Sequence, residues 1–359
     1  MDLGWERSFK LEIEEKGVFG LDIGSSSVNA IQLEKKKGDW TVLAASRVRI
    51  APGEEDRRQI NTVGAISKCL ELMGIRSRRA VCGISGPEVA VRDFKFPLLP
   101  RDEVESAVLF EAAQVCPFNA NDATVDYQLI GNGKDSTNGI LVAATNKLIN
   151  SKTELAKQAS VDCVLMDVDG LALLNCLSEC EKGVAEQTTA ILNVGNSYTT
   201  LVIMNGRGGP AVPFIRDVAY AGNDIVKAIA AENDMSEEST KEILFRGTNS
   251  TERPIRIEES LEKACDKLIV DVMETLRYYT AQDKSSFVEK VFVCGGFGAV
   301  QGLVELLDKH LPSKVVLWNP FETLVCETGQ SCKEILQEDG PAMTVAAGLA
   351  MRAISYVHN

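Results

Sequence analysis

Long apolar runs, histidines and positive charge are all scarce in this 359-residue sequence. No apolar stretch approaches the roughly 18 residues that a membrane-spanning helix needs, so we expect no such helix. The two histidines, His310 and His358, argue against a histidine-based catalytic triad. The formal net charge of −13 argues against nucleic acid as the main partner, because phosphate contacts require clustered Lys and Arg. The charge does not exclude protein partners, nor a membrane partner that is bound through a peptide.

The sequence also lacks paired Cys-x-x-Cys spacing. Most of the ten cysteines lie in apolar runs, as Cys82, Cys265 and Cys294 do. A thiol in such a run behaves as a small hydrophobe, which favours reduced structural cysteines over a zinc site. The first segment, residues 1–16, is a polar leader unlike a signal peptide. We therefore expect a cytoplasmic protein.

One order of elements occurs twice along the chain. An apolar strand, a Gly/Ser turn, a strand, a polar turn, a third strand and a helical pattern follow one another in both copies. The expected strands are residues 18–23, 28–34 and 40–48 in the first copy, and residues 189–194, 199–204 and 211–216 in the second. This repetition predicts an α/β molecule with two related lobes.

Further elements lie between and after the two copies. The expected helices cover residues 100–113, 146–158, 255–282 and 343–355, and the expected strands cover residues 80–84, 124–130, 140–145 and 291–294. The last of these strands leads into the loop Gly295-Gly296-Phe297-Gly298. Residues 124–145 thus add a strand pair that the repeat does not contain.

The turn Asp22-Ile23-Gly24-Ser25-Ser26-Ser27 carries the first chemical signal. Glycine lets the backbone approach closely, and consecutive N–H groups and hydroxyls suit a phosphate chain. Asp22, at the end of a buried strand, is placed to position a hydrated Mg²⁺. A turn-capping role for Asp22 explains the residue equally well.

Two later turns strengthen that signal. Gly195-Asn196-Ser197 stands at the matching place in the second copy, where it can close over the phosphates from the other side. The loop of Gly295, Gly296 and Gly298 can let adenine and ribose rest on bare backbone. Taken alone, this loop reads better as a tight strand-to-helix connection, but the three turns together are more specific.

At these residues the chain resembles the actin-like ATPase superfamily, and within it the PilM family of type IV pilus assembly proteins, which is related to FtsA. The resemblance runs through residues 18–28, 110–118, 126–128, 141–145, 167–173 and 319–321. It implies an α/β, actin-like (ribonuclease H-like) two-lobed fold with an FtsA/PilM-type inserted subdomain. The implied divisions are a leader (1–16), a first lobe (17–87), the inserted subdomain (88–164), a connecting helix (165–187), a second lobe (188–341) and a closing helix (342–359).

The resemblance also implies a nucleotide site for ATP or ADP with Mg²⁺. Its residues would be Asp22, Gly24, Ser25, Ser26, Ser27, Asn29, Gly195, Asn196, Ser197, Glu242, Gly295, Gly296 and Gly298, with Asp22 holding the metal through water. Three departures from the family's usual residues weaken the case for hydrolysis. Asn29 stands where the family has a Lys, Asn193 stands where it has an Asp, and Phe245 falls near the position of its ribose-contacting Lys. Phosphoryl transfer depends on positioning and charge, so we hypothesise nucleotide binding with weak or absent turnover.

The function implied by the resemblance is assembly. Members of the family act at the inner-membrane platform of type IV pili and bind the cytoplasmic N-terminal peptide of PilN, a single-pass membrane protein. The peptide groove is expected between the first lobe and the inserted subdomain, where Phe94, Phe96 and Phe118 are either lining or core. The alternatives are a GspL-like type II secretion component, an FtsA-like protein, and a small-molecule kinase with Asp169 as its carboxylate.

Overall fold

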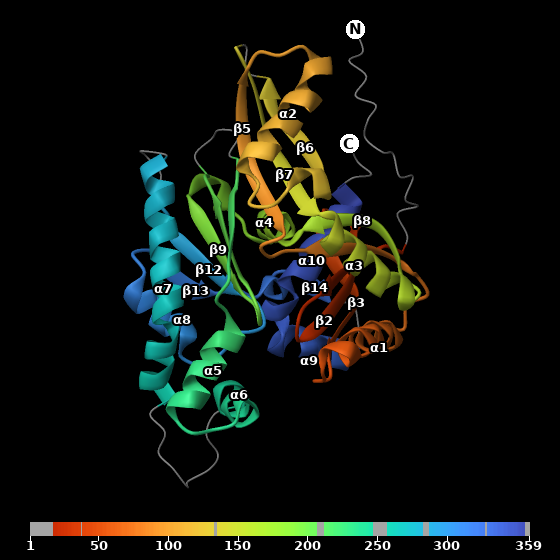
Figure 1. The fold of residues 1–359 in the computed structure, drawn as a ribbon. Coiled ribbons are helices and arrows are strands. Elements are labelled where there is room, and N and C mark those ends of the chain that lie inside the picture. The colour runs from red at the N-terminus through yellow and green to blue at the C-terminus, as the bar shows by residue number, and fades with distance from the viewer. Residues whose placement is uncertain are drawn as a thin grey trace.

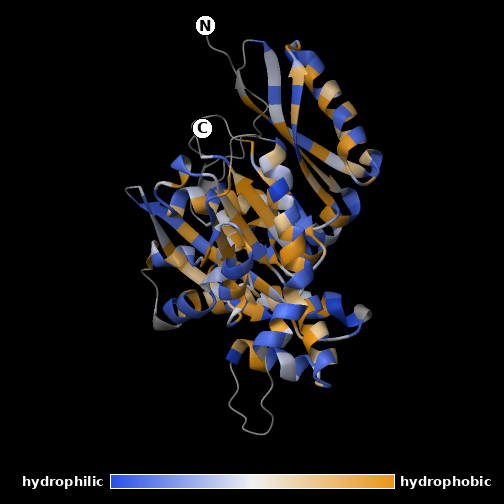
Figure 2. Ribbon diagram, turned by 90° about the vertical axis from the view of Figure 1, so that its left-hand side faces the viewer, coloured by the Kyte–Doolittle hydropathy of each residue, from blue (hydrophilic) through white to orange (hydrophobic). Residues whose placement is uncertain are grey.

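The computed structural model describes residues 17–36, 38–132, 135–206, 212–246, 257–282, 287–326 and 329–355. The predicted leader lies outside these residues. Two lobes, each built on a mixed β-sheet, lie side by side, and a smaller subdomain projects from one end (Figure 1). Hydrophobic residues concentrate in the central strands, while hydrophilic residues dominate the outward faces of the helices (Figure 2). No helix of the described residues is long and apolar enough to cross a membrane.

The first-lobe sheet has the strand order β14-β3-β2-β1-β4-β8. Its strands are β1 (Phe19–Ile23), β2 (Ser27–Lys36), β3 (Asp39–Arg49), β4 (Arg79–Ile84), β8 (Asp162–Val168) and β14 (Val325–Cys326). Helix α1 (Glu55–Met73) packs Ile66, Cys69 and Leu70 into the core against this sheet. It ends at Gly74, whose left-handed φ of 62° suits glycine.

The second-lobe sheet has the order β11-β10-β9-β12-β13. Its strands are β9 (Thr189–Val194), β10 (Thr199–Met204), β11 (Phe214–Val218), β12 (Lys290–Cys294) and β13 (Lys314–Leu317). The helices of this lobe are α5 (Gly222–Glu232), α6 (Glu237–Arg246), α7 (Ile257–Gln282) and α8 (Leu303–His310). If the strands of each lobe are numbered in chain order, both sheets have the strand order 3-2-1-4-5. The first-lobe sheet has β14 as an additional edge strand beside β3. The predicted duplication is confirmed.

The inserted subdomain is a sheet of order β5-β7-β6 under one helix. Its elements are β5 (Val89–Pro97), α2 (Arg101–Val115), β6 (Ala123–Asn132) and β7 (Ser136–Thr145). Phe94 is buried between sheet and helix, and Phe96 stacks on it with ring centroids 4.9 Å apart. Both side chains therefore belong to the subdomain core, and Phe118 is half-buried.

Strand β8 differs from the sequence-based expectation. The boundary predicted between residues 164 and 165 falls inside it, and β8 pairs with β4 in the first-lobe sheet. The connecting helix, α4 (Asp169–Cys180), consequently begins four residues later than predicted. The run Cys163-Val164-Leu165-Met166 carries no alternation because the strand packs on both sides, and periodicity alone does not reveal such a strand.

Helix α10 (Thr344–Ser355) returns from the second lobe, packs on β1 and crosses α4. A Cβ on Gly20 of β1 would lie 2.0 Å from the Ala346 carbonyl oxygen. A Cβ on Gly348 would lie 1.9 Å from the Ala172 carbonyl oxygen. The backbones therefore touch at both places, which fixes α10 against the strand that leads into the Asp22 turn.

Candidate functional site

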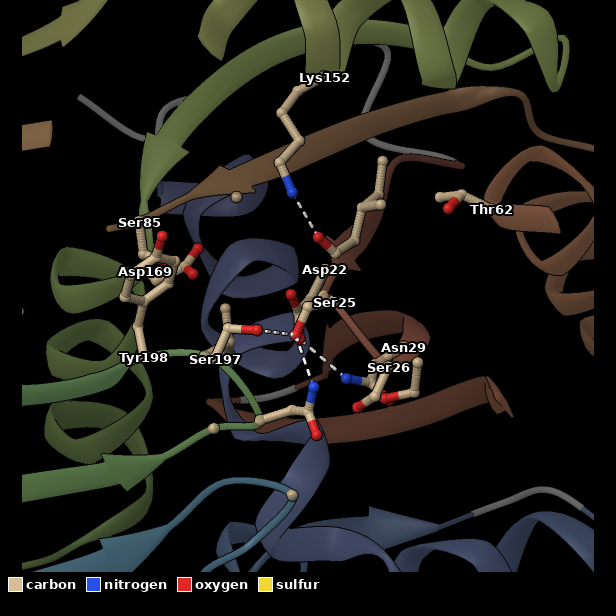
Figure 3. Close-up of a pocket in the computed structure, with 18 of the residues that line it drawn as sticks. Asp22, Ser25, Ser26, Asn29, Thr62, Ser85, Lys152, Asp169, Ser197 and Tyr198 are labelled. Atoms are coloured by element: carbon tan, nitrogen blue, oxygen red, sulfur yellow. Dashed lines mark hydrogen bonds between the residues drawn. The ribbon is translucent and has the colours of Figure 1, made fainter. Parts of the chain in front are cut away.

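A cavity of about 760 Å³ lies where the two lobes face each other (Figure 3). Its wall comes from both turns of the repeat, the Gly295–Gly296 loop, α1, α3 (Asn146–Gln158) and the starts of α4 and α10. Every predicted site residue except Glu242 and Gly298 lines it. The structure thus brings together residues that are far apart in the sequence.

The two hairpins of the repeat have the same local geometry. The Gly24 N–H donates to the Ser27 carbonyl at 3.0 Å, and the Gly195 N–H donates to the Tyr198 carbonyl at 3.1 Å. A Cβ on Gly24 would lie 2.9 Å from the Ser27 oxygen, and one on Gly195 would lie 2.6 Å from the Tyr198 oxygen. Each turn therefore requires its glycine.

The strand registers make the comparison residue by residue. Asp22 faces Asn29 across β1 and β2, and Asn193 faces Thr200 across β9 and β10. In each hairpin, this pair is the second residue pair counted from the turn. Asn193 is thus the second-lobe equivalent of Asp22, which locates the departure noted in the sequence.

The hairpin tips meet across the two lobes. The Ser197 hydroxyl donates to Ser25 Oγ at 2.8 Å, and Asn196 Nδ2 donates to the same oxygen at 3.1 Å (Figure 3). Polar groups of both lobes therefore converge on one point of the cavity. A phosphate oxygen placed there can accept the hydrogen bonds that now join the tips.

The Gly295–Gly296 loop lies against the second hairpin. Gly295 has a φ of +93°, and a Cβ on it would lie 2.4 Å from Asn193 Oδ1. Gly298 has a different role, because its Cβ would lie 2.4 Å from the Cys294 carbonyl oxygen and the residue does not line the cavity. For Gly298 the geometry fits the tight strand-to-helix connection.

Glu242 stands away from the cavity wall. It lies on α6, where its largely exposed carboxylate pairs with Arg246 at 3.4 Å. Phe245 of the same helix packs edge-on against Phe297, with ring centroids 5.9 Å apart. The structure therefore does not bring the Glu242 side chain to the hairpins.

The half-buried Asp22 and the buried Asn29 form a hydrogen-bonded pair in the cavity wall. Burial raises the pKa of Asp22, and the hydrogen bond from Asn29 opposes that rise. Asn29 Nδ2 donates to Asp22 Oδ2 at 2.8 Å and to the Ala342 carbonyl at 3.2 Å. Both amide hydrogens are used inside the protein, so Asn29 positions Asp22 and leaves neither hydrogen for a phosphate.

Asp169 and Lys152 also line the cavity; the sequence offers Asp169 only as the carboxylate of a small-molecule kinase and does not single out Lys152. Burial and the neighbouring Asp22 raise the pKa of Asp169 to about 7. Lys152, on α3, extends across the cavity and donates to the Ile23 carbonyl (Figure 3). No local pattern marks Lys152, because the fold alone brings α3 to the first hairpin.

The donor set fits a nucleotide with a divalent cation. The described wall contains four carboxylates (Asp22, Glu88, Glu154 and Asp169) against two basic residues, Arg58 and Lys152. No cluster of three or more metal-ligating side chains occurs in the described parts of the chain. A cation held there would need phosphate oxygens and water to complete its shell, which is how Mg²⁺ is usually bound.

A separate contact joins the second lobe to the end of the first lobe, in the segment that leads into the inserted subdomain. The Gly86 N–H, just before β5, donates to Asp217 Oδ2 at 2.7 Å, and Thr200 Oγ1 donates to Asp217 Oδ1 at 2.6 Å. The Tyr198 ring covers Gly86, whose φ is +103° and whose Cβ would lie 3.2 Å from Tyr198 Cε2. We call Gly86, Tyr198, Thr200 and Asp217 the interlobe latch.

Comparison with known proteins places this geometry in context. The model of the type IV pilus assembly protein PilM family matches residues 20–354. A chain of the PilM–PilN type IV pilus biogenesis complex superposes with a TM-score of 0.80, with 23% identity over 94% of this chain and 98% of that one.

Two more distant structures share the architecture. The ethanolamine utilization protein EutJ from Carboxydothermus hydrogenoformans has a TM-score of 0.54 and 13% identity, covering 93% of this chain and 88% of its own. The nucleotide-free diol dehydratase-reactivating factor has a TM-score of 0.53 and 10% identity, covering 93% and 99%. The predicted actin-like fold is confirmed.

Proposed function

Because the chain belongs to the PilM family of type IV pilus assembly proteins, we propose that it is a cytoplasmic nucleotide-binding scaffold of the pilus inner-membrane platform. ATP or ADP, with Mg²⁺, lies between the two hairpins. A PilN-like single-pass membrane protein binds through its cytoplasmic N-terminal peptide and keeps the scaffold at the inner membrane. The family match favours this function over a GspL-like component or a small-molecule kinase.

The observation that carries nucleotide binding is the meeting of the hairpins. The Oγ atoms of Ser25 and Ser197, from opposite lobes, lie 2.8 Å apart. Both belong to turns whose glycines let a ligand approach the backbone closely. When bound, Mg²⁺ would supply positive charge to the phosphate oxygens, and the half-buried Asp22 carboxylate would hold its water ligands. Gly295 and Gly296 leave bare backbone beside the second hairpin for the rest of the nucleotide.

We propose that turnover is slow or absent. Asn193, the equivalent of Asp22, presents an amide oxygen against Gly295 in place of a second metal-side carboxylate. Asn29 uses both amide hydrogens on protein acceptors, so it lends no contact to a leaving phosphate. Phosphoryl transfer requires exact positioning and charge stabilisation, so the loss of these groups lowers the rate of hydrolysis more than it lowers the affinity for the nucleotide.

Calorimetric titration of the purified protein with ATP and ADP in the presence of Mg²⁺ tests this function. We expect binding of both nucleotides, a weaker affinity in Asp22→Ala, and phosphate release close to background. Failure of the unaltered protein to bind either nucleotide would refute the nucleotide role. Steady ATP hydrolysis that Asp22→Ala abolishes would refute the scaffold without turnover.

The partner is tested separately. The related structure is a PilM–PilN complex, and a short peptide needs a groove with a few buried anchors to bind well. We expect a labelled peptide from the N-terminus of the candidate PilN-like protein to bind, and a scrambled peptide of equal composition not to. Equal binding of both peptides, or a positive coupled assay with common sugars, would favour another function.

A further inference from the structure

We infer that Lys152 supplies the cationic phosphate contact that the first hairpin lacks. Its role rests on the proposed nucleotide function and assigns to α3 a contact that neither hairpin provides. The starting point is Asn29, which stands in β2 with its side chain on Asp22 Oδ2 and the Ala342 carbonyl. An amide has two hydrogens, and both are engaged.

The geometry places the Lys152 side chain at the first hairpin. Its ammonium donates to the carbonyl of Ile23, the residue directly before Gly24, and lies in the same cavity as Ser25 and Asp22 (Figure 3). That carbonyl is a neutral acceptor. A phosphate oxygen in the cavity carries charge, and a charge-assisted hydrogen bond is roughly twice as strong as a neutral one. Lys152 therefore gains by turning from the carbonyl to the phosphate.

Other cations near the site are less suitable. Arg47 approaches Gly296, but it forms an ion pair with Asp339. Arg58, the remaining basic residue in the described wall, is exposed on α1, where solvent and salt weaken its field. Lys152 is half-buried among cavity residues, so its charge is screened less. These contacts favour Lys152 over both arginines.

The position of Lys152 in the chain has a functional consequence. Helix α3 begins at Asn146, directly after β7, the central strand of the inserted subdomain. A phosphate contact from α3 links the nucleotide to the element that leaves this subdomain. Any ligand that shifts α3 then changes nucleotide affinity, and the nucleotide changes the affinity for that ligand by the same factor.

Replacing Lys152 tests the role. The variant is Lys152→Gln, and its matched control is Lys147→Gln, a lysine on the same helix that is exposed and outside the cavity wall. Calorimetry with ATP, ADP and adenosine gives the affinities. We expect the affinity of Lys152→Gln for ATP and ADP to fall roughly 10- to 100-fold, the usual effect of a lost charged hydrogen bond. Adenosine binding and the control variant stay unchanged.

Two further measurements separate a phosphate contact from a structural role. Lys152→Arg retains most of the affinity for ATP, and ATP binding by Lys152→Gln depends less on salt concentration than binding by the unaltered protein. Circular dichroism melting of each variant shows whether it folds. Unchanged ATP affinity in Lys152→Gln overturns the Lys152 role alone. Loss of adenosine affinity equal to the loss for ATP also overturns it, and failure of the unaltered protein to bind any nucleotide overturns the proposed function as well.

Discussion

Replacing Asp217 by Ala tests whether the interlobe latch holds the second lobe to the first, at the segment that leads into the inserted subdomain. The carboxylate accepts from the Gly86 N–H at 2.7 Å and from Thr200 at 2.6 Å. A hydrogen bond to a charged group contributes about 1.5 to 3 kcal/mol. Burial raises the pKa of Asp217, so keeping it ionised has a cost that offsets part of this gain. We expect a net destabilisation of about 2 to 4 kcal/mol in Asp217→Ala.

Asp217→Asn is the isosteric comparison. The Asn oxygen can still accept from Gly86, while its NH₂ donates to the Thr200 oxygen, so both contacts survive without charge. Its destabilisation should be about 1 kcal/mol or less. The contrast between the Ala and Asn variants separates the hydrogen bonds from the charge.

Hydrogen exchange of the Gly86 amide is the direct assay, because that proton is one of the latch bonds. In Asp217→Ala the amide should exchange about 30- to 1,000-fold faster, since each 1.4 kcal/mol corresponds to a factor of ten. Urea denaturation gives the global change alongside it. If the Gly86 amide stays as protected in Asp217→Ala as in the unaltered protein, the latch does not hold the two lobes together.

Three further predictions follow from the same site. Burial raises the pKa of Asp169 from 3.8 to about 7, so its contribution to the free energy of unfolding is fully present below pH 3.8 and is lost as the pH rises through 7. In urea denaturation, Asp169→Asn should make the free energy of unfolding fall less steeply between these pH values, and an unaltered pH slope would contradict this. Asn193→Asp restores a carboxylate opposite Asp22 and should increase Mg²⁺-dependent phosphate release; an unchanged rate would mean that this amide does not limit turnover. Gly348→Ala forces a Cβ to 1.9 Å from the Ala172 oxygen, so overpacking should lower the free energy of unfolding by about 1 to 3 kcal/mol and lower the melting temperature with it. An unchanged melting temperature would mean that α4 and α10 can separate freely.

Local elements were well predicted from the sequence. The bounds of β9, β10 and α3 match the predicted residues 189–194, 199–204 and 146–158. The two strands are short apolar runs bounded by turn residues, and Thr145 caps the start of the helix. Strand β5 was missed because charged residues such as Arg92 and Asp93 interrupt its apolar residues. Strand β8, residues 162–168, was missed because its apolar run shows no alternation and its pairing with β4 joins segments distant in the sequence.

The site was predicted where its residues are neighbours in sequence, as in the two hairpins. Lys152 and Asp217 were not assigned, because each reaches its partner through the packing of the lobes. Glu242 was placed in the site by resemblance alone, and a helix that presents it to solvent keeps it from the cavity wall. Patterns predict turns, whereas contacts between distant elements depend on the whole fold.

The contact between α10 and β1 also bears on how the protein is made. Gly20 lies against Ala346, more than 300 residues later in the chain. At a synthesis rate of about 5 to 20 residues per second, β1 emerges from the ribosome roughly 15 to 65 seconds before the helix that covers it. The first lobe is therefore the last to be completed, although it is the first to be synthesised. Its uncovered apolar strands have to be protected during that interval.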